Sequence, residues 1–291
     1  MDAPRWRDRF DAFVAKKTRD ALTATLPPYV TECDQPLDDM VSIGNAWTTA
    51  LFGGPFYVSA NPDSKRPTCS LVFVRSADGN TVAANPADLG GGSTDMHLIY
   101  EGLSRVAANA VLAGAGTVRG GDVMFSVWHP ELVRLRTSLG LPRHPIQIVA
   151  TLGGLELDRM LLFNIPDVSA IVLTVGDAAE QMRAALRTRP WVRLIVMRDR
   201  HALRDAFDQL GALSIERISC IGGRRLAHSL GDADLIDDVY LTTSPKRGGD
   251  PDTPLPASAL TGSLIVRKRG TGEETGVVFE HLAPVSRMRG G

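Results

Sequence analysis

The chain has 291 residues, of which 44% are apolar and 22% charged, ordinary proportions for a globular protein with a hydrophobic core. A formal net charge of −1 argues against a polyanionic partner such as nucleic acid. No apolar run approaches the roughly 20 residues that a membrane helix needs, and the charged stretch Met1–Phe10 does not have the pattern of a secretory signal.

The N-terminal part of the chain reads differently from the rest. Apolar residues recur at helical spacing over residues 4–25, which predicts a helix, and Pro27 and Pro28 stop it. Residues 29–66 are rich in proline and glycine and are predicted to be irregular. We therefore expect residues 1–65 to form an N-terminal extension that packs on the main domain or on a partner subunit.

From residue 66 onward, strand and helix patterns alternate. Thr68–Arg75 is a β-rich run that ends in a turn at 76–79, Asp95–Ala108 has a helical pattern with Ser93 or Thr94 as N-cap, and Ala110–Ala113 is a short apolar strand. Further strands are expected at 146–151, 170–174, 192–197 and 217–221, helices at 177–187, 201–211 and 224–230, and final strands at 238–243, 263–268 and 276–281.

This alternation predicts an α/β domain over residues 66–291. Strands separated by helices favour a mostly parallel central sheet flanked by helices on both faces, and the last pair of strands would add antiparallel edges. The three cysteines, Cys33, Cys69 and Cys220, are isolated, which indicates free thiols and a cytoplasmic location. No histidine or cysteine spacing indicates a metal site.

Two segments, Val111–Arg119 and Ile218–Leu226, share one pattern: an apolar strand, a glycine pair and a helix start. Glycine lets the backbone approach a ligand closely, and a helix N-terminus offers unpaired N–H groups that favour phosphate. Neither segment is the Gly-x-Gly-x-x-Gly fingerprint, because Arg119 stands where the third glycine belongs. Each segment is therefore either half of a pyrophosphate cradle or a tight structural turn.

Four segments in order carry a family resemblance: Leu71–Gly79, Gly114–Arg119, Ile221–Gly223 and Leu235–Thr242. With them the chain resembles, over roughly residues 66–282, the reductase domain of riboflavin biosynthesis. That domain is the C-terminal half of a bifunctional deaminase/reductase and is itself similar to dihydrofolate reductase. The resemblance implies a dihydrofolate-reductase-like fold and NADPH-dependent hydride transfer to the ribosyl C1′ of a 5-phosphoribosylamino-pyrimidine.

The resemblance also implies site residues. The cofactor would contact Gly114, Gly116, Thr117, Val118, Arg119, Thr151, Gly222, Gly223, Arg224, Arg225 and Leu226, with the three arginines as candidates for its 2′-phosphate. The substrate would meet Ser76, Asn80, Ser93 and Thr94. Asp78 and Asp122 are the candidate catalytic acids.

Several positions depart from the family's pattern on the substrate side. Asn80 stands where a basic residue is common, and Gly120-Gly121-Asp122 leaves one acid where two are usual. His129-Pro130-Glu131 matches half of the zinc deaminase signature, but its Pro-Cys-x-x-Cys partner is missing, so we expect His129 to be a loop residue and the deaminase activity to be absent.

Other functions therefore stay open. One is a pterin- or dihydrofolate-type reductase, a second is a non-catalytic NADP-binding protein on the same scaffold, and a third is a binder of flavin or another phosphate ligand. We also expect a homodimer, because open sheet edges and the aromatic residues of the extension invite burial against a second chain. Those aromatic residues are Trp6, Phe10, Phe13, Trp47, Phe52, Phe56 and Tyr57.

Overall fold

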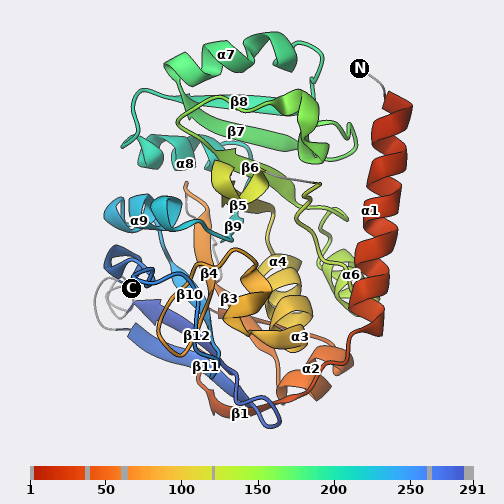
Figure 1. Cartoon of the computed structure of the whole chain (residues 1–291), viewed down its shortest axis with the longest axis vertical. Helices are drawn as coiled ribbons and strands as arrows, with labels where there is room; N and C mark the ends of the chain where they lie inside the picture. Colours follow the sequence, from red (N-terminus) through yellow and green to blue (C-terminus); the bar gives the residue numbers. More distant parts are fainter. Residues whose placement is uncertain (1–2, 37–39, 60–64, 120–121, 261–263, 285–291) are drawn as a thin grey trace.

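Ten strands form one sheet that runs through the whole molecule (Figure 1). The computed structural model describes residues 3–36, 40–59, 65–119, 122–260 and 264–284. In spatial order the strands are β1 (Tyr29–Asp34), β11 (Leu264–Gly272), β12 (Val278–Pro284), β10 (Asp238–Thr243), β4 (Thr68–Arg75), β9 (Arg217–Cys220), β5 (Ala110–Gly114), β6 (Ile146–Ala150), β7 (Ala170–Val175) and β8 (Val192–Met197).

The sheet is mostly parallel, as predicted. From β10 to β8, in the order given, each strand runs parallel to the next. The predicted final pair, β11 and β12, is antiparallel, but neither strand is an edge, because β1 pairs with β11 on its outer side. The N-terminal extension thus supplies the edge strand of the main sheet. Residue 263 of the predicted strand 263–268 lies outside the described residues.

The predicted N-terminal helix is confirmed as α1 (Ala3–Thr23). The prediction that residues 29–66 are irregular is wrong. Besides β1, this stretch forms β2 (Met40–Ile43), α2 (Ala46–Phe52) and β3 (Phe56–Ser59), and β2 pairs with β3 in a separate small sheet. Glycine here marks an element boundary: α2 ends at Gly53, whose φ of 64° suits glycine.

The aromatic residues of the extension are packed within this chain. Trp6, Phe10, Phe52, Phe56 and Tyr57 are buried, and the other two, Phe13 and Trp47, are partly buried against the same clusters. Phe52, Phe56 and Tyr57 surround the buried Lys268 ammonium, which binds Asp34 at 3.2 Å. These aromatic residues therefore give no argument for a second chain, and the homodimer stays a prediction.

Helices cover both faces of the sheet. The predicted helix 95–108 begins earlier, as α3 (Gly92–Thr94), and continues as the π-helix η2 (Asp95–Leu103) and α4 (Ser104–Val106). The prediction that Ser93 or Thr94 caps it is wrong, because both lie inside the first turn and the Thr94 hydroxyl donates to the Pro27 carbonyl oxygen at 2.7 Å.

One hydrophobic cluster joins η2 and α4 to α6 (Pro130–Ser138), which was not predicted, and to α7 (Gly176–Leu186). The cluster on the other side includes residues of α8 (Leu203–Gly211) and α9 (Arg224–Asp232). The bounds of α7, α8 and α9 agree with the predicted helices 177–187, 201–211 and 224–230 within two residues. Within the described parts of the chain, no helix is both long and apolar enough to cross a membrane.

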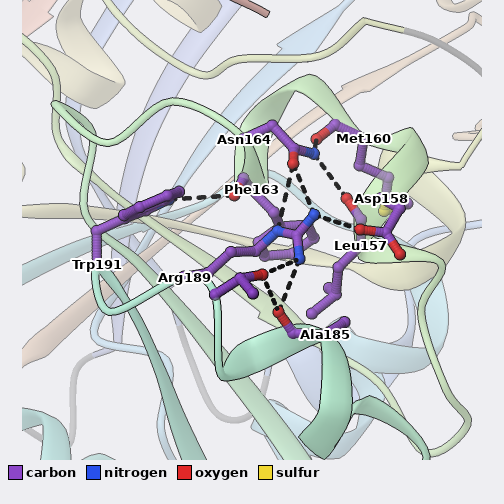
Figure 2. A network of polar contacts seen from close by, with 9 residues as sticks. Leu157, Asp158, Met160, Phe163, Asn164, Ala185, Arg189 and Trp191 are labelled. Carbon is purple, nitrogen blue, oxygen red and sulfur yellow. Dashed lines mark hydrogen bonds and ion pairs between the residues drawn. The ribbon is translucent and has the colours of Figure 1, made fainter. Parts of the chain in front are cut away.

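A buried arginine organises the segment between β6 and β7 (Figure 2). This segment holds the short helices η3 (Leu157–Arg159) and η4 (Leu161–Phe163). Arg189 donates to the Asn164 side-chain oxygen at 2.8 Å and to Asp158, and the Asn164 amide donates to two backbone carbonyl oxygens at 2.7 Å. The loop beyond β6 is thereby fixed to the end of α7.

Candidate functional site

The two glycine turns lie side by side at the carboxyl ends of neighbouring parallel strands. Val111–Arg119 begins within β5, Ile218–Leu226 begins within β9, and these two strands pair directly. The Gly114 amide donates to the Gly222 carbonyl oxygen at 2.9 Å, and the Ile221 amide donates to the Leu112 carbonyl oxygen at 3.0 Å. In open α/β sheets, ligands bind outside the carboxyl ends of the strands. The structure therefore joins the two predicted half-cradles at the edge of the sheet where ligands of such folds bind.

Three glycines shape the space around these turns. A Cβ atom on Gly116 or on Gly223 would meet nothing within 4 Å, so both face open space. Gly222 differs, because its φ of 100° lies in the region that side chains disfavour, and the peptide bond between Gly222 and Gly223 is cis. Backbone at Gly116 and Gly223 is thus accessible to a ligand.

The helix ends after the two turns are unequal. After Gly223, α9 runs for nine residues without a side-chain cap, and the first main-chain bond of its first turn comes from the Ala227 amide. The amides before Ala227 are therefore open to an anion. After Gly114, α5 (Ala115–Val118) is a single turn of four residues. The phosphate-binding pattern is well developed only at the second turn.

The three candidate arginines have different surroundings. Arg119 donates to the Gly154 carbonyl oxygen at 3.3 Å, and Arg224 donates to the Pro254 carbonyl oxygen at 3.0 Å. The Arg225 side chain is exposed, and its guanidinium has no hydrogen-bond or ion-pair partner among the described residues. Arg225 is thus the arginine that is free to meet a ligand.

The remaining predicted cofactor residues lie around the same edge. Thr151 follows β6 and is buried, with its hydroxyl bonded to the Gly153 carbonyl oxygen at 2.5 Å. Val118 is buried and Thr117 partly buried in α5, while Leu226 is buried with its Cβ 3.9 Å from the Cβ position of Gly114. The side chains of Val118 and Leu226 therefore belong to the hydrophobic core next to the two turns.

Three predicted substrate-side residues hold a loop over the end of β4. The Ser76 hydroxyl and the Asn80 amide both donate to the Gly248 carbonyl oxygen, at 2.7 and 3.0 Å. Asp78 accepts from the Gly248 amide at 3.0 Å and from Arg247 at 2.8 Å. The Gly248 hydrogen bond, with a smaller effect of Arg247, lowers the pKa of Asp78. Ser76, Asp78 and Asn80 thus position the loop at 246–254.

The other candidate acid contacts the N-terminal helix. Asp122 forms an ion pair with Arg9 of α1, whose Nε lies 3.3 Å from Asp122 Oδ2. No hydrogen bond links Asp122 to Asp78 in the described part of the structure. Ser93 is exposed, and Gly120 and Gly121 lie outside the described residues. The structure does not link the two candidate catalytic acids directly.

Asp95 is a polar residue of this edge that the sequence did not indicate. It is the first residue of η2, is 8% exposed, and accepts a hydrogen bond from the Thr242 hydroxyl. Burial raises the pKa of Asp95 to about 6, although the Thr242 hydrogen bond opposes this effect. An aspartate at a helix start resembles a cap in the sequence, so only the tertiary structure identifies its burial.

His129 lies in the loop before α6, as predicted, and is the N-cap of that helix. Its ring accepts from the Glu131 amide at 3.3 Å and stacks on Trp47 at 4.0 Å. Across the described ranges, no group of three or more histidine, cysteine, aspartate or glutamate side chains is arranged to hold a metal ion.

Comparisons with known proteins agree on one family. The family model described as the RibD C-terminal domain matches residues 67–265. The chain is 26% identical, over 190 residues, to the 2,5-diamino-6-ribosylamino-4(3H)-pyrimidinone 5′-phosphate reductase of Methanothermobacter thermautotrophicus. That match covers 64% of this chain and 82% of the archaeal reductase.

Two solved structures share the fold. A pyrimidine reductase-like protein from Corynebacterium diphtheriae is 22% identical with a TM-score of 0.62, over 75% of this chain and 91% of that one. A deaminase/5-amino-6-(5-phosphoribosylamino)uracil reductase from Thermotoga maritima is 19% identical with a TM-score of 0.56. The match covers 76% of this chain but 57% of the Thermotoga protein.

Proposed function

The chain belongs to the RibD C-terminal domain family, and we propose that it is a pyrimidine reductase of the riboflavin pathway. In this proposal a hydride passes from NADPH to the ribosyl C1′ of a 5-phosphoribosylamino-pyrimidine. The observation that carries it is the pair of glycine turns joined by the Gly114–Gly222 hydrogen bond and open at Gly116 and Gly223. The archaeal relative is itself named as a reductase of a ribosylamino-pyrimidinone phosphate.

The residues present fit a nicotinamide dinucleotide. Backbone without Cβ atoms at Gly116 and Gly223 leaves the room that a pyrophosphate needs, and the uncapped first turn of α9 supplies amide donors. NADPH, when bound, supplies the hydride, and the protein's part is to hold the donor and acceptor carbons in register. Gly114, Thr117 and Thr151 would line the other side of the cofactor.

The choice of NADPH over NADH rests on positive charge. The Arg225 side chain is exposed, and its guanidinium has no partner among the described residues, so this fork is available to a 2′-phosphate. Arg119 and Arg224 each already donate to a backbone carbonyl oxygen. We therefore assign the phosphate contact first to Arg225.

On the substrate side, the loop at 246–254 would close the site over the pyrimidine. Ser76, Asp78 and Asn80 fix this loop through Gly248. Asp122 would act from the other side, held by Arg9. The roles of these residues toward substrate, including those expected of Ser93 and Thr94, belong to the proposal.

The test has two steps. The first is titration of the protein with NADPH and NADH, followed by nicotinamide fluorescence. The second is NADPH oxidation in the presence of either a ribosylaminopyrimidine phosphate or dihydrofolate. We expect tighter binding of NADPH than of NADH, and oxidation with the pyrimidine only.

Each other result has a defined meaning. Oxidation with dihydrofolate alone would indicate a pterin-type reductase. NADPH binding without turnover of either substrate would indicate a non-catalytic NADP-binding protein, and absence of binding would refute the proposal. Light scattering at micromolar concentration tests the accompanying proposal of a homodimer.

A further inference from the structure

Asp95 lies at the same edge of the sheet as the glycine turns. Its hydrogen-bond donor, Thr242, is the second-last residue of β10 and pairs with Val74, the second-last residue of β4. Since β10, β4, β9 and β5 run parallel, their carboxyl ends meet at one edge. Asp95 is therefore placed beside the strand ends from which the proposed site is built.

The local backbone leaves room for this carboxyl group. A Cβ atom on Gly91 would lie 2.5 Å from Asp95 Oδ2, so the space is kept by a residue without a side chain. Oδ1 accepts from Thr242, whereas Oδ2 has no hydrogen-bond partner among the described residues. One carboxylate oxygen is thus fixed and the other is left available.

Few charged groups surround Asp95. Two causes raise the pKa of Tyr29 in β1. The larger is the burial of Tyr29 itself, and the smaller is the charge of Asp95. Lys246, in the segment after β10, packs its aliphatic stem against Gly90. Asp95 has no ion-pair partner among the described side chains. Burial therefore keeps its carboxyl group protonated to higher pH than that of an exposed aspartate, with a pKa of about 6.

Asp78 is a poorer proton donor than Asp95. It is bound by Arg247 and by the Gly248 amide, and its pKa is lowered. Cations and N–H donors stabilise the ionised form of a carboxyl group, which has no proton to give. Asp95 is bound instead by a neutral hydroxyl group.

The proposed reaction needs a proton donor. As hydride from NADPH forms the new C1′–H bond, the bond between C1′ and the ring oxygen O4′ breaks, and its electron pair stays on O4′. That oxygen must take one proton to become the free hydroxyl group of the ribityl chain. Each turnover therefore oxidises one NADPH and consumes one proton.

We propose that Asp95 is the proton donor of this reduction, giving its proton to O4′ as C1′ receives the hydride. The inference rests on the proposed function. Thr242 fixes the carboxyl group through Oδ1, Oδ2 carries the proton, and water restores it after product release.

The test is single-turnover oxidation of NADPH with the ribosylaminopyrimidine phosphate between pH 5 and 8. In the unaltered protein the rate falls about tenfold per pH unit above the pKa of Asp95, because only the neutral form donates. We expect Asp95→Asn to be at least ~100-fold slower and independent of pH in this range. Its NADPH dissociation constant should not change.

Two further variants separate chemistry from structure. Thr242→Val removes a hydrogen bond that lowers the pKa of Asp95, so the falling limb of the pH profile should move to higher pH. Asp177→Asn, at an exposed acid in the first turn of α7, is the matched control and should keep the original profile. The side-chain oxygen of the Asp95→Asn variant can still accept from Thr242, so melting temperatures should confirm that this variant is folded.

The outcomes are distinct. If the unaltered protein turns over and Asp95→Asn keeps its rate and its pH profile, the role of Asp95 is refuted while the proposed function stands. An unmoved pH limb in Thr242→Val would also contradict it. If the unaltered protein binds NADPH but reduces no ribosylaminopyrimidine, the proposed function fails and the role of Asp95 falls with it.

Discussion

The amide nitrogen of Gly114 lies 2.9 Å from the carbonyl oxygen of Gly222, and this hydrogen bond joins the two glycine turns. The bond uses main-chain atoms only. It therefore sets the separation of the two turns without the help of any side chain.

Alanine at Gly116 or Gly223 should weaken NADPH binding without unfolding the protein. The added Cβ meets no protein atom within 4 Å, but it enters the space assigned to the pyrophosphate. We expect at least a tenfold rise in the NADPH dissociation constant, or ~1.4 kcal/mol, with an unchanged melting temperature. Fluorescence titration and thermal unfolding measure the two effects.

Gly222→Ala is the contrasting variant for this pair. Its φ of 100° disfavours any side chain, so we expect a loss of unfolding free energy of about 1–2 kcal/mol. Full NADPH affinity in both Gly116→Ala and Gly223→Ala would mean that the turns are structural only.

Arg225→Ala should reduce the preference for NADPH over NADH. A charged hydrogen bond to the 2′-phosphate contributes about 1.5–3 kcal/mol, so NADPH affinity should fall roughly tenfold to a hundredfold. NADH affinity should stay constant, because NADH lacks that phosphate. Arg193→Ala, at an exposed arginine of β8, is the control, and an equal loss for both nucleotides would contradict the assignment.

Asp78 should make the order of the 246–254 loop depend on pH. Because the pKa of Asp78 is lowered in the folded protein, its stabilising effect is complete above the unfolded pKa of ~3.9. The effect is lost as pH falls through the lower, folded pKa. The Gly248 amide resonance should therefore titrate in acid in the unaltered protein, and not in Asp78→Asn.

Arg247→Ala is the control for this titration. It removes the weaker cause of the pKa shift and keeps the Gly248 hydrogen bond, so the resonance should still titrate. A Gly248 resonance that titrates equally in Asp78→Asn would show that another group holds the loop.

Asn164→Ala should destabilise the protein much more than Asp158→Ala, although both side chains bind Arg189 (Figure 2). Asn164 is buried, and its loss leaves a buried guanidinium and two carbonyl oxygens with fewer partners, a cost of about 3 kcal/mol. The Asp158 side chain is 78% exposed, so its ion pair contributes less than ~1 kcal/mol. Urea unfolding compares them, and equal losses would contradict the argument.

The main α/β pattern could be predicted because its signals are local. Strands such as Thr68–Arg75 and helices such as 224–230 can be recognised from the spacing of their apolar residues and from the turn residues beside them. The family motifs are local in the same sense, and the family model confirms the resemblance they carried.

What could not be predicted depends on partners far away in the chain. β1 is short and pairs with β11, which lies more than 200 residues further along the chain. No local signal therefore distinguishes the sequence of β1 from that of a loop. Asp78 and Asp122 stood out as acids, but their contacts with Gly248 and Arg9 come from other segments. Asp95 shows the same limit, because its burial depends on where β10 lies.

The pairing of β1 with β11 also bears on how the chain is made. During synthesis, β1 leaves the ribosome long before residues 264–272 are made. Its backbone N–H and C=O groups therefore lack their β11 partners while most of the sheet is translated. Val30, Glu32 and Asp34, which are exposed in the folded protein, then face solvent. Contacts of such long sequence separation form slowly, so closure of this edge is expected late in folding.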